Sequence, residues 1–181
     1  LAEGDPGIAA RVRLEQGDMR AWRTFERFDV VLIACSSITH LLTLEDQLAA
    51  WRNAFDHLRP GGRFIVDVTM PDLGAYVESL RTPPRALTEV DLDQQDATTR
   101  TRLIRQKTTR FDMFAQRAEI QFLYDKFEDG THVSRYVSDF ASHIYFPREL
   151  TLLYLQAGFN IEAVWADYTF RAATSQAREI V

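Results

Sequence analysis

Cysteine is almost absent from this chain of 181 residues, and its basic residues give no excess of positive charge. The single cysteine, Cys35, excludes an internal disulfide framework and is typical of a reducing compartment, so we expect a cytoplasmic protein. The formal net charge of −5 argues against a protein that follows the phosphates of a nucleic acid. No apolar run approaches the ~20 residues that span a bilayer. Neither a nucleic acid nor a membrane is expected as a partner.

Glycine is also scarce, and its placement is informative. The chain has eight glycines, and no two of them stand at Gly-x-Gly spacing. Gly4 and Gly7 are three apart in a polar turn that no strand precedes. The chain opens at Leu1 without methionine, and residues 1–3 resemble the last turn of a helix whose beginning is missing. We therefore expect a truncated chain, whose native form has further residues upstream.

The first part of the chain alternates between strand and helix patterns. Residues 28–34 form a nearly continuous apolar run, which predicts a strand covered on both faces. A helix follows, because one apolar stripe recurs at helical spacing through Leu44, Leu48, Trp51, Phe55 and Leu58. Thr43 is its expected N-cap, and Arg59-Pro60-Gly61-Gly62 is expected to end it. With strands predicted at 10–15 and 64–68, the pattern predicts an α/β fold with a Rossmann-like, open, mostly parallel sheet.

The pattern changes after Pro71. A helical lid is predicted at 73–80 and a linker at 82–84, followed by strand-like stretches at 98–110, 118–127 and 131–146. Asp129-Gly130 predicts a hairpin between the last two, so we expect an inserted antiparallel β-sheet. Pro147 and Gly158 then bracket a helix, before strands expected at 159–170 and 177–181. The expected domains are a core of residues 1–72 and 147–181 and an insertion of residues 73–146.

In an open α/β sheet, ligands bind at the carboxyl ends of the strands. Three such ends are readable, at Gly17–Met19, Cys35–His40 and Asp67–Pro71. Asp18 could accept hydrogen bonds from a ligand's amino group, or simply form a turn. Ser36 could line a pocket or cap a turn. The residues alone leave both alternatives open.

Three blocks at matching spacing resemble the middle of class I S-adenosylmethionine-dependent methyltransferases. They are Val12–Arg20, Phe28–Ile33 and the Leu-Arg-Pro-Gly-Gly segment before the strand at Phe64. The segment from Phe146 to Phe159 is similar to the family's late helix and following strand. The expected inserted sheet is similar to that of small-molecule N-methyltransferases acting on amino sugars and glycopeptides. The resemblance covers about residues 11–170 and is weak between 71 and 138.

The resemblance implies S-adenosylmethionine as the cofactor and no metal. Asp18 would bind the adenine amino group, Met19 would pack on the adenine, and Cys35 and Ser36 would lie beside the cofactor. His40 would lie near the reacting methyl group and is the first candidate for a base that removes the acceptor's proton.

Two further side chains are candidates on the predicted inserted sheet. His143 is the second candidate base, and Tyr145 is a candidate orienting group. A lone histidine is more often structural than catalytic, so each assignment competes with a structural role. His57 and His132 are interpreted as surface residues of a helix and a hairpin.

The chain also departs from the family. It has no counterpart of the glycine-rich loop after the first strand or of the acid that binds the ribose hydroxyls. The family's first two strands lie between those matching 12–15 and 28–34, so their absence would leave a gap of roughly 10 Å. We therefore expect the first strands of the fold to be missing from this chain.

The leading functional prediction is methyl transfer to nitrogen or oxygen of a small-molecule acceptor. The alternative is a non-catalytic, methyltransferase-like module that forms a homodimer through the inserted sheet, with the stripe of Ile120, Phe122 and Tyr124 as its interface. Binding of the cofactor discriminates between them. A nicotinamide-dependent oxidoreductase is disfavoured, because its fingerprint glycines are missing too.

Overall fold

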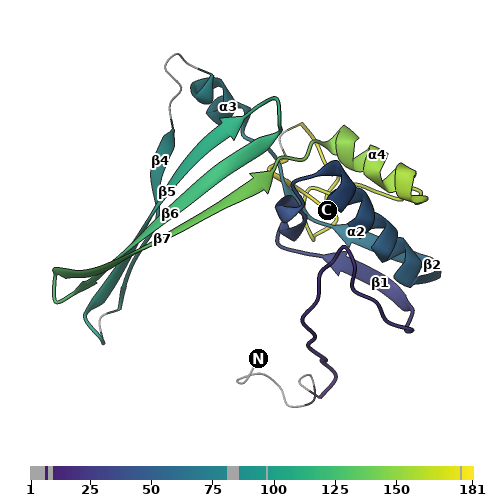
Figure 1. The fold of residues 1–181 in the computed structure, drawn as a ribbon, viewed down its shortest axis with the longest axis horizontal. Helices are drawn as coiled ribbons and strands as arrows, with labels where there is room; N and C mark the ends of the chain where they lie inside the picture. Colours follow the sequence, from purple (N-terminus) through teal and green to yellow (C-terminus); the bar gives the residue numbers. More distant parts are fainter. Residues whose placement is uncertain (1–6, 8–9, 81–85, 97, 176) are drawn as a thin grey trace.

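The computed structural model describes residues 7, 10–80, 86–96, 98–175 and 177–181. It consists of an α/β body from which a long antiparallel sheet projects (Figure 1). The body contains β1 (Phe28–Ile33), α2 (Leu44–His57), β2 (Leu58–Val66) and α4 (Pro147–Ala157). Of the helices described, none is long and apolar enough to cross a membrane.

Helix α2 confirms the predicted helix and its N-cap. The Thr43 hydroxyl accepts a hydrogen bond from the Asp46 N–H at 3.1 Å, which satisfies one of the free donors of the first turn. Trp51 on the predicted stripe is fully buried, whereas Leu44 and Phe55 at its margins are exposed. Helix α4 likewise begins at Pro147 and ends at Gly158, whose φ of 96° suits glycine.

Strands β1 and β2 pair in parallel, from Val30 with Arg63 to Ile33 with Val66. The segment Arg59–Gly62 was predicted only to end the helix, but it forms the irregular start of β2. A register shift between Phe28 and Val30 accommodates it, and Gly61 has a φ of 80°.

The prediction that β1 is covered on both faces was wrong for part of the strand. Val30 and Leu32 are each about half exposed. They line a cavity of about 580 Å³, whose far wall includes Arg13, Glu15 and Met19. Among the described residues no strand pairs with this edge of β1, so the apolar side chains lack a covering element.

Two predicted strands are absent from the described structure. Residues 12–17 are irregular and Leu14 is 77% exposed, and residues 159–164 belong to no described strand. Alternation alone does not make a strand, because an extended segment needs a neighbour to satisfy its backbone groups. After these residues, Trp165 exchanges two backbone hydrogen bonds with Val181, and β8 (Glu179–Ile180) pairs with β3 (Val68–Thr69).

The projecting sheet has four strands, one more than predicted. In order these are β4 (Leu87–Asp96), β5 (Thr101–Asp112), β6 (Arg117–Glu128) and β7 (Thr131–His143), each antiparallel to the next. Strand β4 escaped prediction because its sequence is acidic and contains no aromatic residue. The Asp129-Gly130 hairpin is as predicted, with φ of 45° and 79°.

Helix α3 (Leu73–Ser79) occupies the predicted lid, while the predicted linker at 82–84 lies outside the described residues. Tyr76 on α3 stacks against Phe111 of β5, with ring centroids 4.6 Å apart. This contact fixes α3 against the end of the projecting sheet nearest the body.

Candidate functional site

The loop that follows β1 is held by one carboxylate, that of Asp67. Asp67 directly follows β2 and is 2% exposed. Its carboxylate accepts the backbone N–H of Cys35 at 2.9 Å and that of Ser36 at 2.6 Å. Because β1 and β2 are parallel, their carboxyl ends lie at the same edge, which brings the acid and the loop together.

The same loop carries backbone strain. Cys35 and Ser36 have φ of 58° and 54°, a left-handed conformation that costs non-glycine residues about 1–3 kcal/mol each. The hydrogen bonds to Asp67 offset this cost. A further hydrogen bond stabilises the loop, because the Ser36 hydroxyl accepts the Thr69 N–H at 3.0 Å. Backbone strain that the surrounding structure holds in place is typical of a functional site.

Tyr168 completes this arrangement, and no sequence motif pointed to it. Its hydroxyl donates to the Asp67 carboxylate, and this hydrogen bond raises the pKa of Tyr168 to about 12. Burial raises the pKa of Asp67, but the hydrogen bonds from Tyr168, Ser36 and Cys35 outweigh it and leave the pKa lowered. Asp67 is therefore a charged acceptor at neutral pH. An acid directly after a strand was readable, but its partner 101 residues later was not.

His40 is the candidate base that this loop presents. It ends the short 3₁₀ helix η1 (Ser37–His40), which starts directly after Ser36. Its ring lies 5.8 Å from that of Phe140 on β7. The structure thus brings Cys35, Ser36 and His40 together in one connection, with His40 facing the projecting sheet.

Asp18 and Met19 lie in a separate turn. The Asp18 carboxylate binds the guanidinium of Arg20, from which it accepts hydrogen bonds at 2.6–3.1 Å, and these lower its pKa to about 2. Arg20 also binds Asp46 on α2, which ties the turn to that helix. Met19 packs against the core and lines the same cavity as Ile33 at the end of β1. The adenine-binding roles of Asp18 and Met19 stay predictions.

His143 and Tyr145 are buried. The His143 Nε2 lies 2.8 Å from the Glu149 carboxylate, which also accepts a hydrogen bond from Gln116 at 2.9 Å. The Tyr145 hydroxyl donates to the Ile38 carbonyl at 3.2 Å. Tyr145 therefore fixes the 3₁₀ helix that carries His40. The roles of His143 as second candidate base and of Tyr145 as an orienting group stay predictions.

The interpretation of His57 as a surface residue was wrong. His57 is 4% exposed, its Nδ1 lies 2.7 Å from the Asn53 carbonyl, and its Nε2 accepts the Thr24 N–H at 3.2 Å. His132, by contrast, is exposed on the β6–β7 hairpin.

The Glu149–His143 pair makes stability depend on pH. Burial raises the pKa of Glu149, but hydrogen bonds, first that of His143, leave it below its usual value. A carboxylate with a lowered folded pKa stabilises the fold above its unfolded pKa of about 4.3, and this contribution disappears as pH falls through the folded pKa. We expect Glu149→Gln to be less stable than the parent at pH 7 and the difference to shrink below about pH 4. Urea unfolding at both pH values measures it.

The matched control for this prediction is Glu119→Gln, because Glu119 is exposed on β6. It should change the free energy of unfolding by less than about 0.5 kcal/mol at either pH. A Glu149→Gln deficit of equal size at pH 7 and below pH 4 would contradict the stabilising role of the Glu149 carboxylate.

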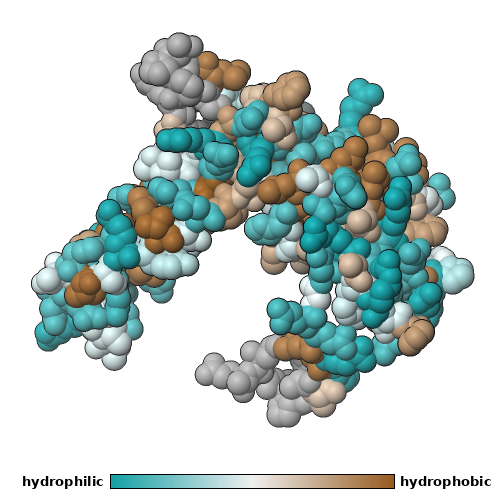
Figure 2. Space-filling model, in the orientation of Figure 1, coloured by the Kyte–Doolittle hydropathy of each residue, from teal (hydrophilic) through white to brown (hydrophobic). Residues whose placement is uncertain are grey.

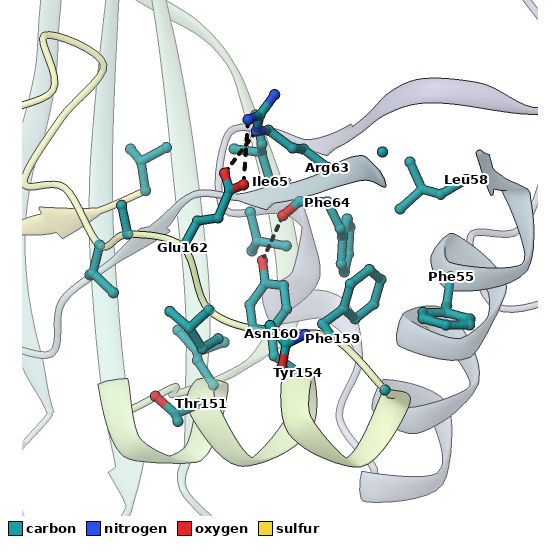
Figure 3. A pocket seen from close by; sticks show the side chains of 18 of the residues that line it. Phe55, Leu58, Arg63, Phe64, Ile65, Thr151, Tyr154, Phe159, Asn160 and Glu162 are labelled. Carbon is teal, nitrogen blue, oxygen red and sulfur yellow. Dashed lines mark hydrogen bonds and ion pairs between the residues drawn. The ribbon is translucent and has the colours of Figure 1, made fainter. Parts of the chain in front are cut away.

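A second large cavity lies at the other edge of the body sheet. It measures about 760 Å³ and separates β2 from residues 160–165 (Figure 3). Arg63 and Glu162 form an ion pair across it at 2.7 Å, and the Tyr154 hydroxyl reaches the Phe64 carbonyl at 3.5 Å. Neither His40 nor Ser36 lines this cavity, so it is an open sheet edge and not the candidate catalytic site.

Solved structures of S-adenosylmethionine-dependent methyltransferases share this fold. A methyltransferase from Clostridium acetobutylicum matches with a TM-score of 0.70 at 14% identity, over 93% of this chain and 62% of its own. CalS10, an amino pentose methyltransferase from Micromonospora echinaspora bound to S-adenosylmethionine, matches with a TM-score of 0.65 at 15% identity, over 91% of this chain and 61% of its own.

A third match is the glycopeptide N-methyltransferase MtfA with bound S-adenosylmethionine. Its TM-score is 0.55 at 20% identity, over 99% of this chain and 62% of its own. The chain thus spans about three-fifths of the length of these structures. No protein-family model and no curated protein sequence matches it. At these identities the likeness establishes the α/β methyltransferase-like fold.

Proposed function

We propose that the chain is part of an S-adenosylmethionine-dependent methyltransferase that acts on an amine of a small molecule. The chain would supply the residues that bind the acceptor and the adenosine part of the cofactor. The observation that carries the proposal is the strained Cys35–Ser36 loop, held by Asp67 at the carboxyl ends of β1 and β2. The choice of nitrogen is supported by the amino pentose and glycopeptide N-methyltransferases with the same fold, and the amino pentose enzyme supports an amino sugar as the acceptor.

The cofactor fits the described residues in part. Met19 offers an apolar surface for a flat ring, in the cavity that Ile33 at the end of β1 also lines, and the Cys35–Ser36 loop follows that end of the strand. The methionine part needs close backbone approach, for which the family uses glycines. The described glycines with positive φ lie elsewhere, in the start of β2 (Gly61), a hairpin (Gly130) and a helix end (Gly158). The proposed activity therefore requires a methionine-binding loop that the described residues do not provide.

The chemistry assigned to the chain's own residues is simple. S-adenosylmethionine supplies a methyl group on a positively charged sulfur, so orientation of the acceptor nitrogen accounts for much of the acceleration. His40 would accept the proton that the nitrogen gives up. Tyr145 would hold the backbone of η1 and so keep the imidazole in place. The projecting sheet would cover this side of the site.

A second candidate function is the non-catalytic module that dimerises through the projecting sheet. Two observations favour it. Arg20 binds the Asp18 carboxylate that was expected to bind adenine, and the described glycines form no cofactor loop. A pure interaction module does not need to bind the cofactor, so the two functions predict different results with S-adenosylhomocysteine.

The test is thermal unfolding of the chain with and without S-adenosylhomocysteine. Saturation at about 100 times the dissociation constant adds ~2.7 kcal/mol, which should raise Tm by roughly 5–10 °C. Adenosine, which lacks the amino acid part, serves as the comparison ligand and should give most of the shift if the chain binds the adenosine side. No shift with either ligand up to millimolar concentration would overturn the enzymatic proposal and favour the module.

A further inference from the structure

One face of the projecting sheet carries a continuous aromatic strip, which we define as Phe140, Phe122, Tyr124 and Tyr136. Neighbouring rings have centroids 5.6–6.0 Å apart. The pairing explains the strip, because Tyr124 lies directly opposite Tyr136 and residues two apart on a strand share a face. Spacings of this size lie within the range of favourable aromatic pairs, so the four rings form one continuous surface.

The strip begins at the candidate base. The ring of Phe140 lies 5.8 Å from that of His40, so the strip runs outward from His40 along β6 and β7. Phe140, Phe122 and Tyr124 are partly buried, and Tyr136 at the outer end is 66% exposed. A broad hollow separates the projecting sheet from the N-terminal part of the chain in the space-filling view (Figure 2).

The basic side chains beside the strip are neutralised. Arg105 lies over the Phe122 ring at 4.6 Å and forms a two-armed ion pair with Asp91, with both contacts at 2.8 Å. Lys107 pairs with Glu89 at 3.3 Å. Lys126, the remaining basic residue on this face of β5–β7, pairs with Glu128 at 2.6 Å. A ligand that carries phosphate groups would therefore have to break an existing ion pair to gain a cationic partner.

The opposite face of the sheet differs in character. It carries the ion pairs of Asp93 with Arg102 and of Asp125 with Arg135. Its hydrogen bond between Gln121 and Asp139 adds to this polar surface. The aromatic rings are thus concentrated on the face that meets His40, which supports a role in binding at the site.

We propose that the aromatic strip binds an uncharged, flat or apolar ring attached to the reacting amino sugar, so that the acceptor is a glycoside of an apolar aglycone. The inference rests on the proposed function, because His40 marks the reacting end of the strip. Stacking of the aglycone supplies binding energy remote from the reacting nitrogen and holds that nitrogen at His40. A free amino sugar is too small to reach the outer rings, and a nucleotide-linked sugar would bring a diphosphate to a face without a free cation.

Calorimetric titration with three probes tests this inference. The probes are phenyl glucosaminide, glucosamine and uridine diphosphate glucosamine. We expect phenyl glucosaminide to bind at least about tenfold more tightly than glucosamine, the ratio that contacts with two stacked rings give. Equal affinity of these two probes would overturn the inference, and so would tightest binding of the nucleotide sugar.

Variants locate the binding. Phe122→Leu with Tyr124→Leu should abolish the preference for the phenyl glycoside, while Phe114→Leu, at a fully exposed turn residue, should preserve it. Unchanged preference in the double variant would overturn the inference. A parent that elutes as a dimer in size-exclusion chromatography with light scattering, and a double variant that elutes as a monomer, would also overturn it by making the strip an interface between copies.

The response to S-adenosylhomocysteine separates this inference from the proposed function. A thermal shift with S-adenosylhomocysteine but no preference for the phenyl glycoside overturns only the role of the strip. The preference without any thermal shift overturns the methyltransferase proposal and leaves the strip as a ring-binding surface. The double variant should show the full thermal shift, because its substitutions lie outside the residues assigned to the cofactor.

Discussion

Replacing Trp51 by alanine is expected to lower the free energy of unfolding by about 3–5 kcal/mol, the range for a large aromatic residue removed from a core. Trp51 is 0% exposed and lies at the centre of an aromatic cluster. Its ring is 5.6 Å from Phe64, 5.7 Å from Tyr154 and 6.3 Å from Tyr145. These neighbours come from β2, α4 and the end of the projecting sheet, so one substitution loosens the contacts between all of them and α2.

Chemical unfolding of the Trp51→Ala variant measures this effect. The control is Phe114→Ala, because Phe114 is fully exposed and its loss should change stability by less than about 0.5 kcal/mol. A Trp51→Ala variant within about 1 kcal/mol of the parent would show that the cluster is not the organising core.

Replacing Asp67 by alanine should have the second largest effect, and it should act on both stability and binding. The substitution leaves the Cys35 and Ser36 N–H groups and the Tyr168 hydroxyl without their acceptor. Loss of a charged acceptor that three partly buried hydrogen bonds share costs about 3 kcal/mol. The strained loop would then relax, and we expect the thermal shift with S-adenosylhomocysteine to disappear.

Tyr168→Phe is the matched control for Asp67→Ala. It removes one of the three hydrogen bonds and keeps the two that hold the loop, so it should cost about 1 kcal/mol and leave the ligand response. An Asp67→Ala variant that still shows the parent's thermal shift would mean that the loop does not need the carboxylate to keep its shape.

The sequence predicted those elements whose determinants are local. Helix α2 follows from an apolar stripe and the Thr43 cap, and α4 follows from Pro147 and Gly158 at its ends. The hairpin between β6 and β7 follows from Asp129-Gly130. Each of these signals lies within a few residues of the structure that it specifies.

The wrong strand predictions share a physical cause. Residues 10–15 and 159–170 alternate in polarity, but strand formation depends on a neighbour that a local pattern does not reveal. The half-exposed Val30 and Leu32 show the same dependence, because the run at 28–34 was expected to be covered on both faces. In all three segments, strand formation or burial depends on partners that are remote in sequence.

The sequence predicted the segments of the candidate site but not the hydrogen bonds that join them. The strand-end rule pointed to Cys35–His40 and to the segment that begins at Asp67. It did not reveal that Asp67 holds the backbone of the first segment, or that Tyr168 joins them. It also did not reveal the pairing of His143 with Glu149.

The most direct test of the central claim is hydrogen–deuterium exchange of the chain with and without S-adenosylhomocysteine. If the chain binds the cofactor as proposed, two segments should exchange more slowly. They are residues 17–22 around Met19 and residues 34–40, from the loop that Asp67 binds to His40. Helix α4 should exchange at the same rate in both conditions, because none of its residues lines the cavity beside β1 or hydrogen-bonds to the Cys35–Ser36 loop. Protection confined to α4 or to the cavity between β2 and residues 160–165, or no protection at saturating ligand, would contradict the account.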